Sequence, residues 1–238
     1  MTVAVTLDGD GAMTETRGPC ADSHVGPNLV LDPKTVAYKD HLAIGIATAT
    51  AADDASLVSA VTILVNKAYA EVESDIFKPG YERTTDAEVA QLIRDGHLAL
   101  ATLHLDHPRD AHSPSSLPPV KHVVDGEVVG CVHIKRRSPT LGNFAMFALD
   151  ARFRRFGLGT RMVEFAEGHC RQLGCTTMQL EVLVPTWFEH ANKIRMQAWY
   201  QRLGYSIVEL RDFGEDYPAL IPLLAGPCAY KIFEKPLV

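Results

Sequence analysis

The sequence predicts an α/β protein with one mixed, twisted sheet of six or seven strands flanked by about four helices. In the second half of the chain, strand patterns alternate with helix patterns, which is typical of parallel strands joined by a crossover helix. In the first half, two helix patterns follow one strand pattern. Of 238 residues, 47% are hydrophobic and 22% are charged, which provides enough apolar material for a sizeable core.

Individual elements follow from local patterns. Residues 53–54 are acidic and open a helix whose apolar residues recur at helical spacing. Thr85, with Glu88 three residues later, predicts the capped start of a second helix. An Asp-Gly pair predicts a hairpin turn at residues 125–126. The expected strands are 42–46, 98–103, 123–124, 128–134, 144–149, 178–184, 205–210 and 228–235, and the later helices are 157–173 and 192–203.

Segments without a period separate these elements. Residues 1–40 are rich in Gly, Thr, Asp and Pro, so we expect an N-terminal arm, flexible or laid over the core, before one domain spanning 41–238. Residues 104–121 contain His-Pro, Ser-Pro and Pro-Pro steps and predict a long surface loop. Gly174 and Gly204 each follow a helix pattern, where a left-handed C-cap favours glycine.

Charge and composition exclude several classes of protein. The formal net charge of −6 lacks the basic excess that nonspecific nucleic-acid binding needs, so no nucleic-acid partner is expected. The uncharged stretches 42–52 and 217–230 are shorter than the roughly 20 apolar residues of a membrane span, and no membrane partner is expected. No Lys or Arg precedes Arg17, so the expected location is the cytoplasm. The five cysteines show no zinc-type spacing, and no metal is expected.

The segment 149–160 carries the sharpest local signal. A strand ends there, two glycines permit close approach of a ligand to the backbone, and an amphipathic helix begins. Unpaired amides and the positive end of the helix dipole favour an anion at such a helix start, and a pyrophosphate fits best. The alternative is a solvated arginine-rich turn with a glycine for packing. Two phosphates would neutralise the four arginines that cluster here, namely Arg152, Arg154, Arg155 and Arg161.

Three motifs in this order resemble the GNAT superfamily of N-acetyltransferases. Arg154-x-x-Gly157-x-Gly159 resembles its R/Q-x-x-G-x-G/A signature, between a strand and a helix. Leu180-Glu181-Val182 looks like the L-E-V of its fifth strand. The segment 198–205 is similar to the Y-x-x-x-G-F/Y pattern of the following helix. The resemblance covers residues 40–238 and implies a GNAT-type sheet and the binding of acetyl-coenzyme A (acetyl-CoA).

The resemblance also implies which residues bind the cofactor. The backbone of Phe147, Ala148 and Leu149 would pair with the pantetheine arm like an extra strand. Family members often place an asparagine seven residues before the helix tyrosine, against the cofactor arm; here Lys193 occupies that position, with Asn192 one residue away. The residues implied around the pyrophosphate are Arg154, Arg155, Phe156, Gly157, Leu158, Gly159 and Thr160.

For catalysis, the resemblance implies an acid and a base. Tyr200 matches the tyrosine that protonates the departing thiolate in many family members, and the alternative is an amphipathic core residue. Glu181 resembles the general base of ribosomal-protein N-terminal acetyltransferases, and the alternative is an ordinary strand carboxylate. Asn143 stands where histone-type members carry a basic glutamate, which leaves Asp150 and His133 as further candidates.

The expected function is transfer of an acetyl group from acetyl-CoA to a primary amine of a small molecule, by direct attack in a ternary complex. One alternative is acetylation of a protein N-terminus or lysine. Others are a non-catalytic module that holds acyl-CoA, and an α/β protein with an accidental signature. A homodimer is one arrangement that the sequence allows.

Aromatic residues mark the expected acceptor side. Phe77 and Tyr81 follow the first helix, and Phe213 and Tyr217 lie in the segment 211–227, which predicts a closed pocket rather than an open peptide groove. A Trp-Phe pair at residues 187–188 either walls a substrate pocket or packs the long loop before the last helix.

Overall fold

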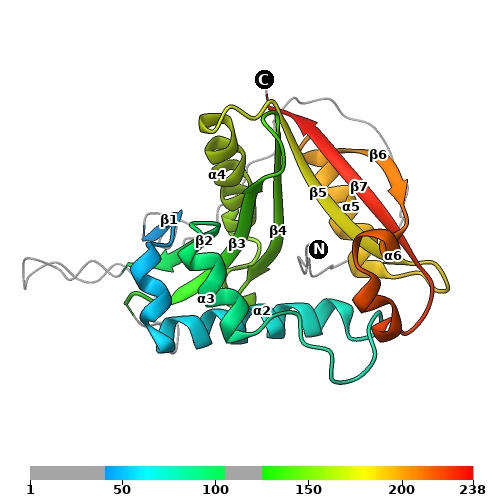
Figure 1. Cartoon of the computed structure of the whole chain (residues 1–238), viewed down its shortest axis with the longest axis horizontal. Helices are drawn as coiled ribbons and strands as arrows, with labels where there is room; N and C mark the ends of the chain where they lie inside the picture. Colours follow the sequence, from blue (N-terminus) through cyan, green and yellow to red (C-terminus); the bar gives the residue numbers. More distant parts are fainter. Residues whose placement is uncertain (1–40, 105–124, 238) are drawn as a thin grey trace, which may run out of the picture.

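The computed structural model describes residues 41–104 and 125–237, which form a seven-stranded sheet with helices on both faces (Figure 1). The strand order is β1-β2-β3-β4-β5-β7-β6. Only β4 and β5 are parallel, so the sheet is mixed as predicted. The strands are β1 (Leu42–Ile46), β2 (Leu98–Leu103), β3 (Val128–Arg136), β4 (Leu141–Leu149), β5 (Thr177–Pro185), β6 (Ser206–Arg211) and β7 (Cys228–Pro236).

Four helices of eight residues or more lie in the described parts of the chain, as the sequence predicts. They are α2 (Ala55–Glu73), α3 (Asp86–Arg94), α4 (Leu158–Gln172) and α5 (Ala191–Arg202). The segment after β6 was expected to be a loop, but it contains the short helix α6 (Phe213–Asp216) and a 3-10 turn (Pro218–Leu223). Asp212 caps α6, accepting a hydrogen bond from the Gly214 amide at 2.7 Å, which a periodicity search over one turn cannot detect.

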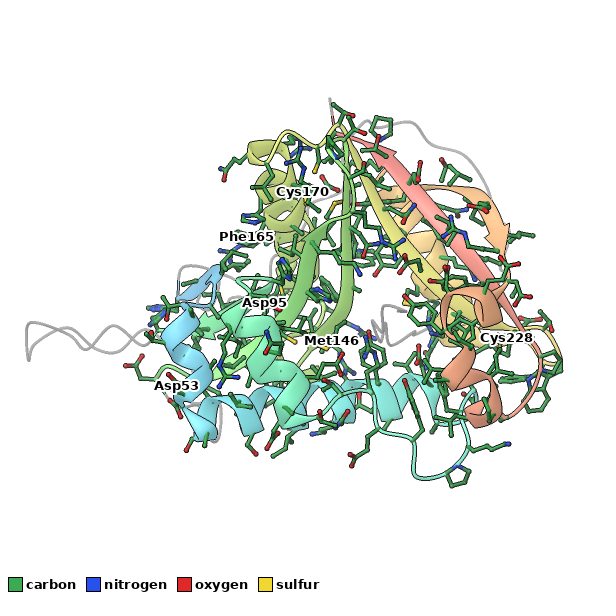
Figure 2. The ribbon with its side chains drawn as sticks, viewed as in Figure 1. Asp53, Asp95, Met146, Phe165, Cys170 and Cys228 are labelled. Atoms are coloured by element: carbon green, nitrogen blue, oxygen red, sulfur yellow. The ribbon has the colours of Figure 1, made fainter. Side chains whose placement is uncertain are left out.

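Side chains alternate between the two faces of the sheet and form two cores. Met146 and Ala148 of β4 pack with α2 and α3 on one face. Phe144, Phe147 and Leu149 of the same strand pack with α4 and α5 on the other face. Figure 2 shows Met146 on the part of β4 that lies over α2. A third cluster joins the end of α2 to α6, β5 and β7.

Helix α2 begins at a side-chain cap and buries one long stripe. Asp54 accepts hydrogen bonds from the amides of Ser56 and Leu57 at 2.9 and 3.1 Å. By length and composition alone α2 could cross a membrane, and 39% of its most apolar window is buried inside the protein. Its stripe, which includes Val61 and Val65, packs against the sheet as in a core helix.

Other local expectations are confirmed. Thr85 caps α3 and accepts a hydrogen bond from the Glu88 amide at 3.2 Å. Gly174 and Gly204 follow α4 and α5 with φ of 86° and 94°, the left-handed conformation that glycine adopts most easily.

Two expectations need correction or fall outside the described residues. Strand β4 begins at Leu141 rather than at residue 144, because residues 141–143 pair with both β3 and β5. The Asp125-Gly126 turn forms, but it leads into β3 alongside β2, with the Gly126 amide donating to the Leu103 carbonyl at 2.8 Å. The arm 1–40, the loop beyond His104 and the short strand 123–124 lie outside the described residues.

Candidate active site

Strands β4 and β5 pair over only three positions and then part (Figure 1). The last pair joins Asn143 to Gln179. Further along β4, Met146 has φ of 43° and the register with β3 shifts, which marks a β-bulge that bends the strand. Within the described residues, no strand pairs with the β5-facing edge of residues 147–149. Such an edge can add an extended ligand through backbone hydrogen bonds.

The start of α4 lies directly after this edge. Gly157 is the N-cap with φ of 76°, and no side chain caps the helix. In residues 41–104 and 125–237, the structure shows no acceptor for the amides of Leu158, Gly159 and Thr160. A Cβ added at Gly159 would lie 3.3 Å from Leu149, so the helix packs closely on the end of β4. These amides and the helix dipole form a site for an anion.

The neighbouring arginines contribute less to this anion site than the sequence suggests. Arg152 pairs with Asp150 at 2.9 Å and also with Glu127. Arg154 is largely buried and donates to Glu71 of α2 at 2.7 Å and to the Leu149 carbonyl at 3.3 Å. Arg152 and Arg154 are therefore already paired with carboxylates and need no phosphate for charge balance. Arg154 connects the turn after β4 to α2.

Tyr200 lies in an aromatic cluster at the centre of the molecule. Its ring is fully buried beside Phe144, Tyr205 and Phe233, with ring centroids 5.9 to 6.3 Å away. Its hydroxyl has no hydrogen-bond partner in the described structure. Burial raises the pKa of Tyr200 well above its ordinary value, and the nearby Tyr69 raises it further. The phenol is therefore protonated at neutral pH, and it is a weaker acid than an ordinary tyrosine.

Glu181 lies on β5, two residues beyond the last pair with β4. It is buried and forms an ion pair with Arg137 at 2.9 Å. It also accepts a weak hydrogen bond from the side-chain amide of Asn143 at 3.4 Å. Burial alone would raise the pKa of Glu181, but nearby positive charges, Arg137 and Lys135 among them, outweigh it and hold the pKa below its ordinary value. Glu181 is therefore ionised at neutral pH and is a weaker base than a free glutamate.

The two further candidate bases lie in different surroundings. Burial, with Lys135 and other positive groups, lowers the pKa of His133 to about 3, so its imidazole is neutral at pH 7. Asp150 accepts a hydrogen bond from the Arg152 amide at 2.8 Å and caps the short turn after β4. Burial raises the pKa of Asp150, but its bonds to Arg152 outweigh this and lower it.

The residues around the start of α5 differ from the family pattern. The Asn192 side chain accepts a hydrogen bond from Arg195 of the same helix. Lys193 is fully buried, and its ammonium binds Glu73 of α2 at 2.5 Å. The position seven residues before Tyr200 is thus occupied by a charge that connects α5 to α2.

A cavity of about 180 Å³ lies between the C-terminal half of α2 and the segment 77–83. Phe77 and Tyr81 line it and stack with ring centroids 3.9 Å apart, whereas Phe213 and Tyr217 do not line it. Tyr69 also lines it.

Phe213 and Tyr217, which were also expected on the acceptor side, pack into the protein. Phe213 and Tyr217 contact Tyr230, with ring centroids 5.3 and 5.9 Å away. Trp187 lies against Gly226, where an added Cβ would come within 2.5 Å of its ring nitrogen. The rest of the Trp187 side chain is open to solvent, with 52% of the residue exposed.

The structure adds three charged residues that the sequence did not identify as site residues. Glu73 and Arg83 line the cavity, and Arg137 binds Glu181. Glu73 follows Tyr69 by four residues on the apolar face of α2, a misplaced charge that could have been noticed. Arg83 and Arg137 lie outside helices and strands, where no periodicity marks them.

The fold and the site together are typical of one class of protein. Its members have a mixed α/β domain in which two parallel strands, here β4 and β5, diverge next to a helix that begins at a glycine, here α4. The model of the Acetyltransferase (GNAT) family matches residues 74–205, more than half of the chain, so this protein belongs to the GNAT acetyltransferase family. A search of curated protein sequences found no match. No group of three or more potential metal ligands occurs within the described residues.

Solved structures share this fold. Ard1 from Thermoplasma volcanium is 18% identical with a TM-score of 0.50, over 83% of this chain and 99% of that chain. An aminoglycoside 6'-N-acetyltransferase complexed with coenzyme A is 14% identical with a TM-score of 0.51, over 77% and 92%. An aminoglycoside 6'-acetyltransferase type Ii is 15% identical with a TM-score of 0.51, over 82% and 97%. At these identities the likeness concerns the fold alone.

Proposed function

We propose that the protein transfers the acetyl group of acetyl-CoA to a primary amine of a small molecule within a ternary complex. The observation that carries the proposal is the unpaired edge of β4 at residues 147–149, next to the uncapped start of α4. The amide-containing pantetheine arm suits the strand edge, and the pyrophosphate suits the helix amides. The aminoglycoside 6'-N-acetyltransferase that shares this fold is complexed with coenzyme A, which supports the choice of cofactor.

The proposed reaction is a direct acyl transfer. The acceptor's ammonium group first loses a proton to the solvent. The neutral amine nitrogen then attacks the thioester carbonyl carbon, and β4 amides stabilise the oxyanion of the tetrahedral intermediate. The carbon–sulfur bond then breaks, the nitrogen keeps the acetyl group, and the thiolate takes a proton from the Tyr200 hydroxyl. Glu181, or a water that it orders, accepts the proton that the amine loses, and that proton later returns to Tyr200.

The size of the cavity supports a small acceptor over a protein. Its volume of about 180 Å³ lies below the roughly 300–1,000 Å³ typical of pockets for drug-sized ligands. The stacked rings of Phe77 and Tyr81 close one wall, where a peptide acceptor would need an open groove.

The test is titration with acetyl-CoA by calorimetry, followed by a thiol-release assay against small amines, amino acids and peptides. We expect saturable binding and thiol release with small amines but not with peptides. Release with peptides alone would instead support a protein acetyltransferase, and binding without release would support a non-catalytic module. Absence of acetyl-CoA binding would overturn the proposal.

A further inference from the structure

The cavity beside α2 has two oppositely charged, buried residues on its wall. Glu73 is 3% exposed and Arg83 is 7% exposed. The Oε2 atom of Glu73 and the Nε atom of Arg83 are buried without a hydrogen-bond partner in the described structure. A negative and a positive side chain on the wall of one cavity suit a ligand that carries both complementary charges.

Arg83 is held in place by its surroundings. The Asn66 side chain accepts hydrogen bonds from the amides of Arg83 and Thr84 at 2.9 and 3.0 Å and donates to the Thr84 carbonyl at 3.0 Å. The guanidinium lies over the Tyr69 ring, 5.2 Å from its centroid, and its nearest carboxylate partner, Glu88, is 4.0 Å away. A guanidinium can bind a carboxylate through two parallel hydrogen bonds.

Glu73 is also fixed, but only through one of its oxygens. Its Oε1 accepts from Lys193 at 2.5 Å, while Oε2 remains available. An ammonium or amine of the ligand can donate to this oxygen. The Glu73 and Lys193 charges offset each other, so the cavity does not require a ligand of large net charge.

The wall of the cavity that carries Phe77 and Tyr81 is held in place by hydrogen bonds to the segment 222–223. Lys78 donates to the Pro222 carbonyl through its side chain at 2.6 Å and to the Leu223 carbonyl through its amide at 2.7 Å. These bonds hold the segment that carries Phe77 and Tyr81. A braced cavity of about 180 Å³ has room for a compact molecule.

We propose that the acceptor is a small zwitterion of the amino-acid class, whose carboxylate binds Arg83 and whose ammonium group donates to Glu73. This inference rests on the proposed acetyltransferase function and narrows its substrate class. It predicts that an amino acid is a better acceptor than the amine left when its carboxylate is removed.

The experiment compares amino acids with their decarboxylated amines, for example phenylalanine with phenethylamine, in the thiol-release assay. For the unmodified protein we expect a KM at least about tenfold lower for the amino acid. Arg83→Gln should raise that KM by about 10- to 100-fold and leave the KM of the amine and the Kd of acetyl-CoA within about twofold. Glu73→Gln leaves Lys193 without its buried partner, so thermal unfolding must first show that this variant is folded. In the folded variant the KM of both acceptors should rise, because both carry an amine.

The matched control is Arg94→Gln. Arg94 is exposed on α3, pairs with Asp53 at 3.5 Å and does not line the cavity, so its loss should change neither KM. Arg83→Lys keeps the positive charge but lacks the planar guanidinium group that binds a carboxylate through two hydrogen bonds. Its KM for the amino acid should therefore lie between those of the unmodified protein and Arg83→Gln. It also provides a second variant if Arg83→Gln does not fold, which thermal unfolding checks.

Two results would overturn the inference. One is an unmodified enzyme that does not prefer the amino acid, and the other is a preference that survives Arg83→Gln. If only amines without a carboxylate turn over, the proposed acetyltransferase function is supported, and the proposal that the acceptor is a zwitterion is wrong. If no acceptor turns over, calorimetric titration with the amino acids measures binding to the cavity independently of catalysis. Binding that Arg83→Gln abolishes would support the inference, and absence of binding would contradict it.

Discussion

The Tyr200 hydroxyl is buried among aromatic rings without a hydrogen-bond partner in the described structure. An unpartnered hydroxyl of this kind costs about 1–3 kcal/mol of stability compared with a partnered one. A phenylalanine would fill the same space without that cost. The catalytic role proposed for Tyr200 would account for a hydroxyl at this position.

Tyr200→Phe should lower the turnover number by about 100-fold or more, because the departing thiolate loses its proton donor. The melting temperature should stay the same or rise, since the change removes an unpartnered buried group. Steady-state kinetics and thermal unfolding on the same preparation measure both effects.

Tyr205→Phe is the matched control. The Tyr205 hydroxyl donates to Glu167 at 2.9 Å, so its removal should cost about 1 kcal/mol of stability and leave turnover unchanged. Equal turnover for Tyr200→Phe and the unmodified enzyme would show that Tyr200 is not the proton donor and that its role is packing in the core.

At the scale of elements, α4 has a left-handed glycine at each end. Gly157 begins the helix with φ of 76° and Gly174 follows it with φ of 86°. A Cβ at either position would meet no atom within 4 Å, so both positions are open. Asparagine tolerates the left-handed conformation better than other residues with a side chain, so the same substitution can be compared at both ends.

Gly157→Asn should weaken acetyl-CoA binding by about tenfold or more, because its side chain would occupy the space in front of the helix amides that hold the pyrophosphate. Gly174→Asn should cause a similar, small loss of stability and leave acetyl-CoA affinity unchanged. Calorimetric titration gives the affinities, and thermal unfolding gives the stabilities. Identical affinities for the two variants would show that the start of α4 does not bind the pyrophosphate.

At the scale of the whole molecule, the sheet consists of two parts joined by a short parallel contact. The β1–β4 part and the β5–β7 part share three register pairs. Helices α2 and α5 provide a second connection: Lys193 binds Glu73 at 2.5 Å, and the His190 ring bonds the Val72 carbonyl at 2.9 Å. Because the Lys193–Glu73 pair is buried, loss of one partner leaves the other charge uncompensated in the interior.

Lys193→Met should therefore lower the free energy of unfolding by about 3–5 kcal/mol. Arg94→Met, at an ion pair whose side chains are 50% and 78% exposed, should lower it by no more than about 1 kcal/mol. Denaturant unfolding curves measure both. A Lys193→Met variant no less stable than the Arg94→Met control would show that the buried pair does not hold the two parts together.

Local features of this structure were predictable because their causes are local. Thr85 caps a helix through an amide three residues away, and Gly174 ends a helix through its own φ. Hydrophobic periodicity likewise placed the strands and the four long helices. The signature from Arg154 to Gly159 predicted the start of a helix for the same reason, since it depends on a few consecutive residues.

The sequence by itself determined the order of the elements, their caps and the family, since these depend on neighbours along the chain. Only the tertiary structure assigned the partners of the charges: Arg154 to Glu71, Glu181 to Arg137, and Lys193 to Glu73. Glu73 and Lys193 are 120 residues apart in sequence, and no local pattern records such a contact. The cavity depends on the same distant contacts, because packing of separate elements, rather than the preference of any one segment, leaves its charged groups unpartnered.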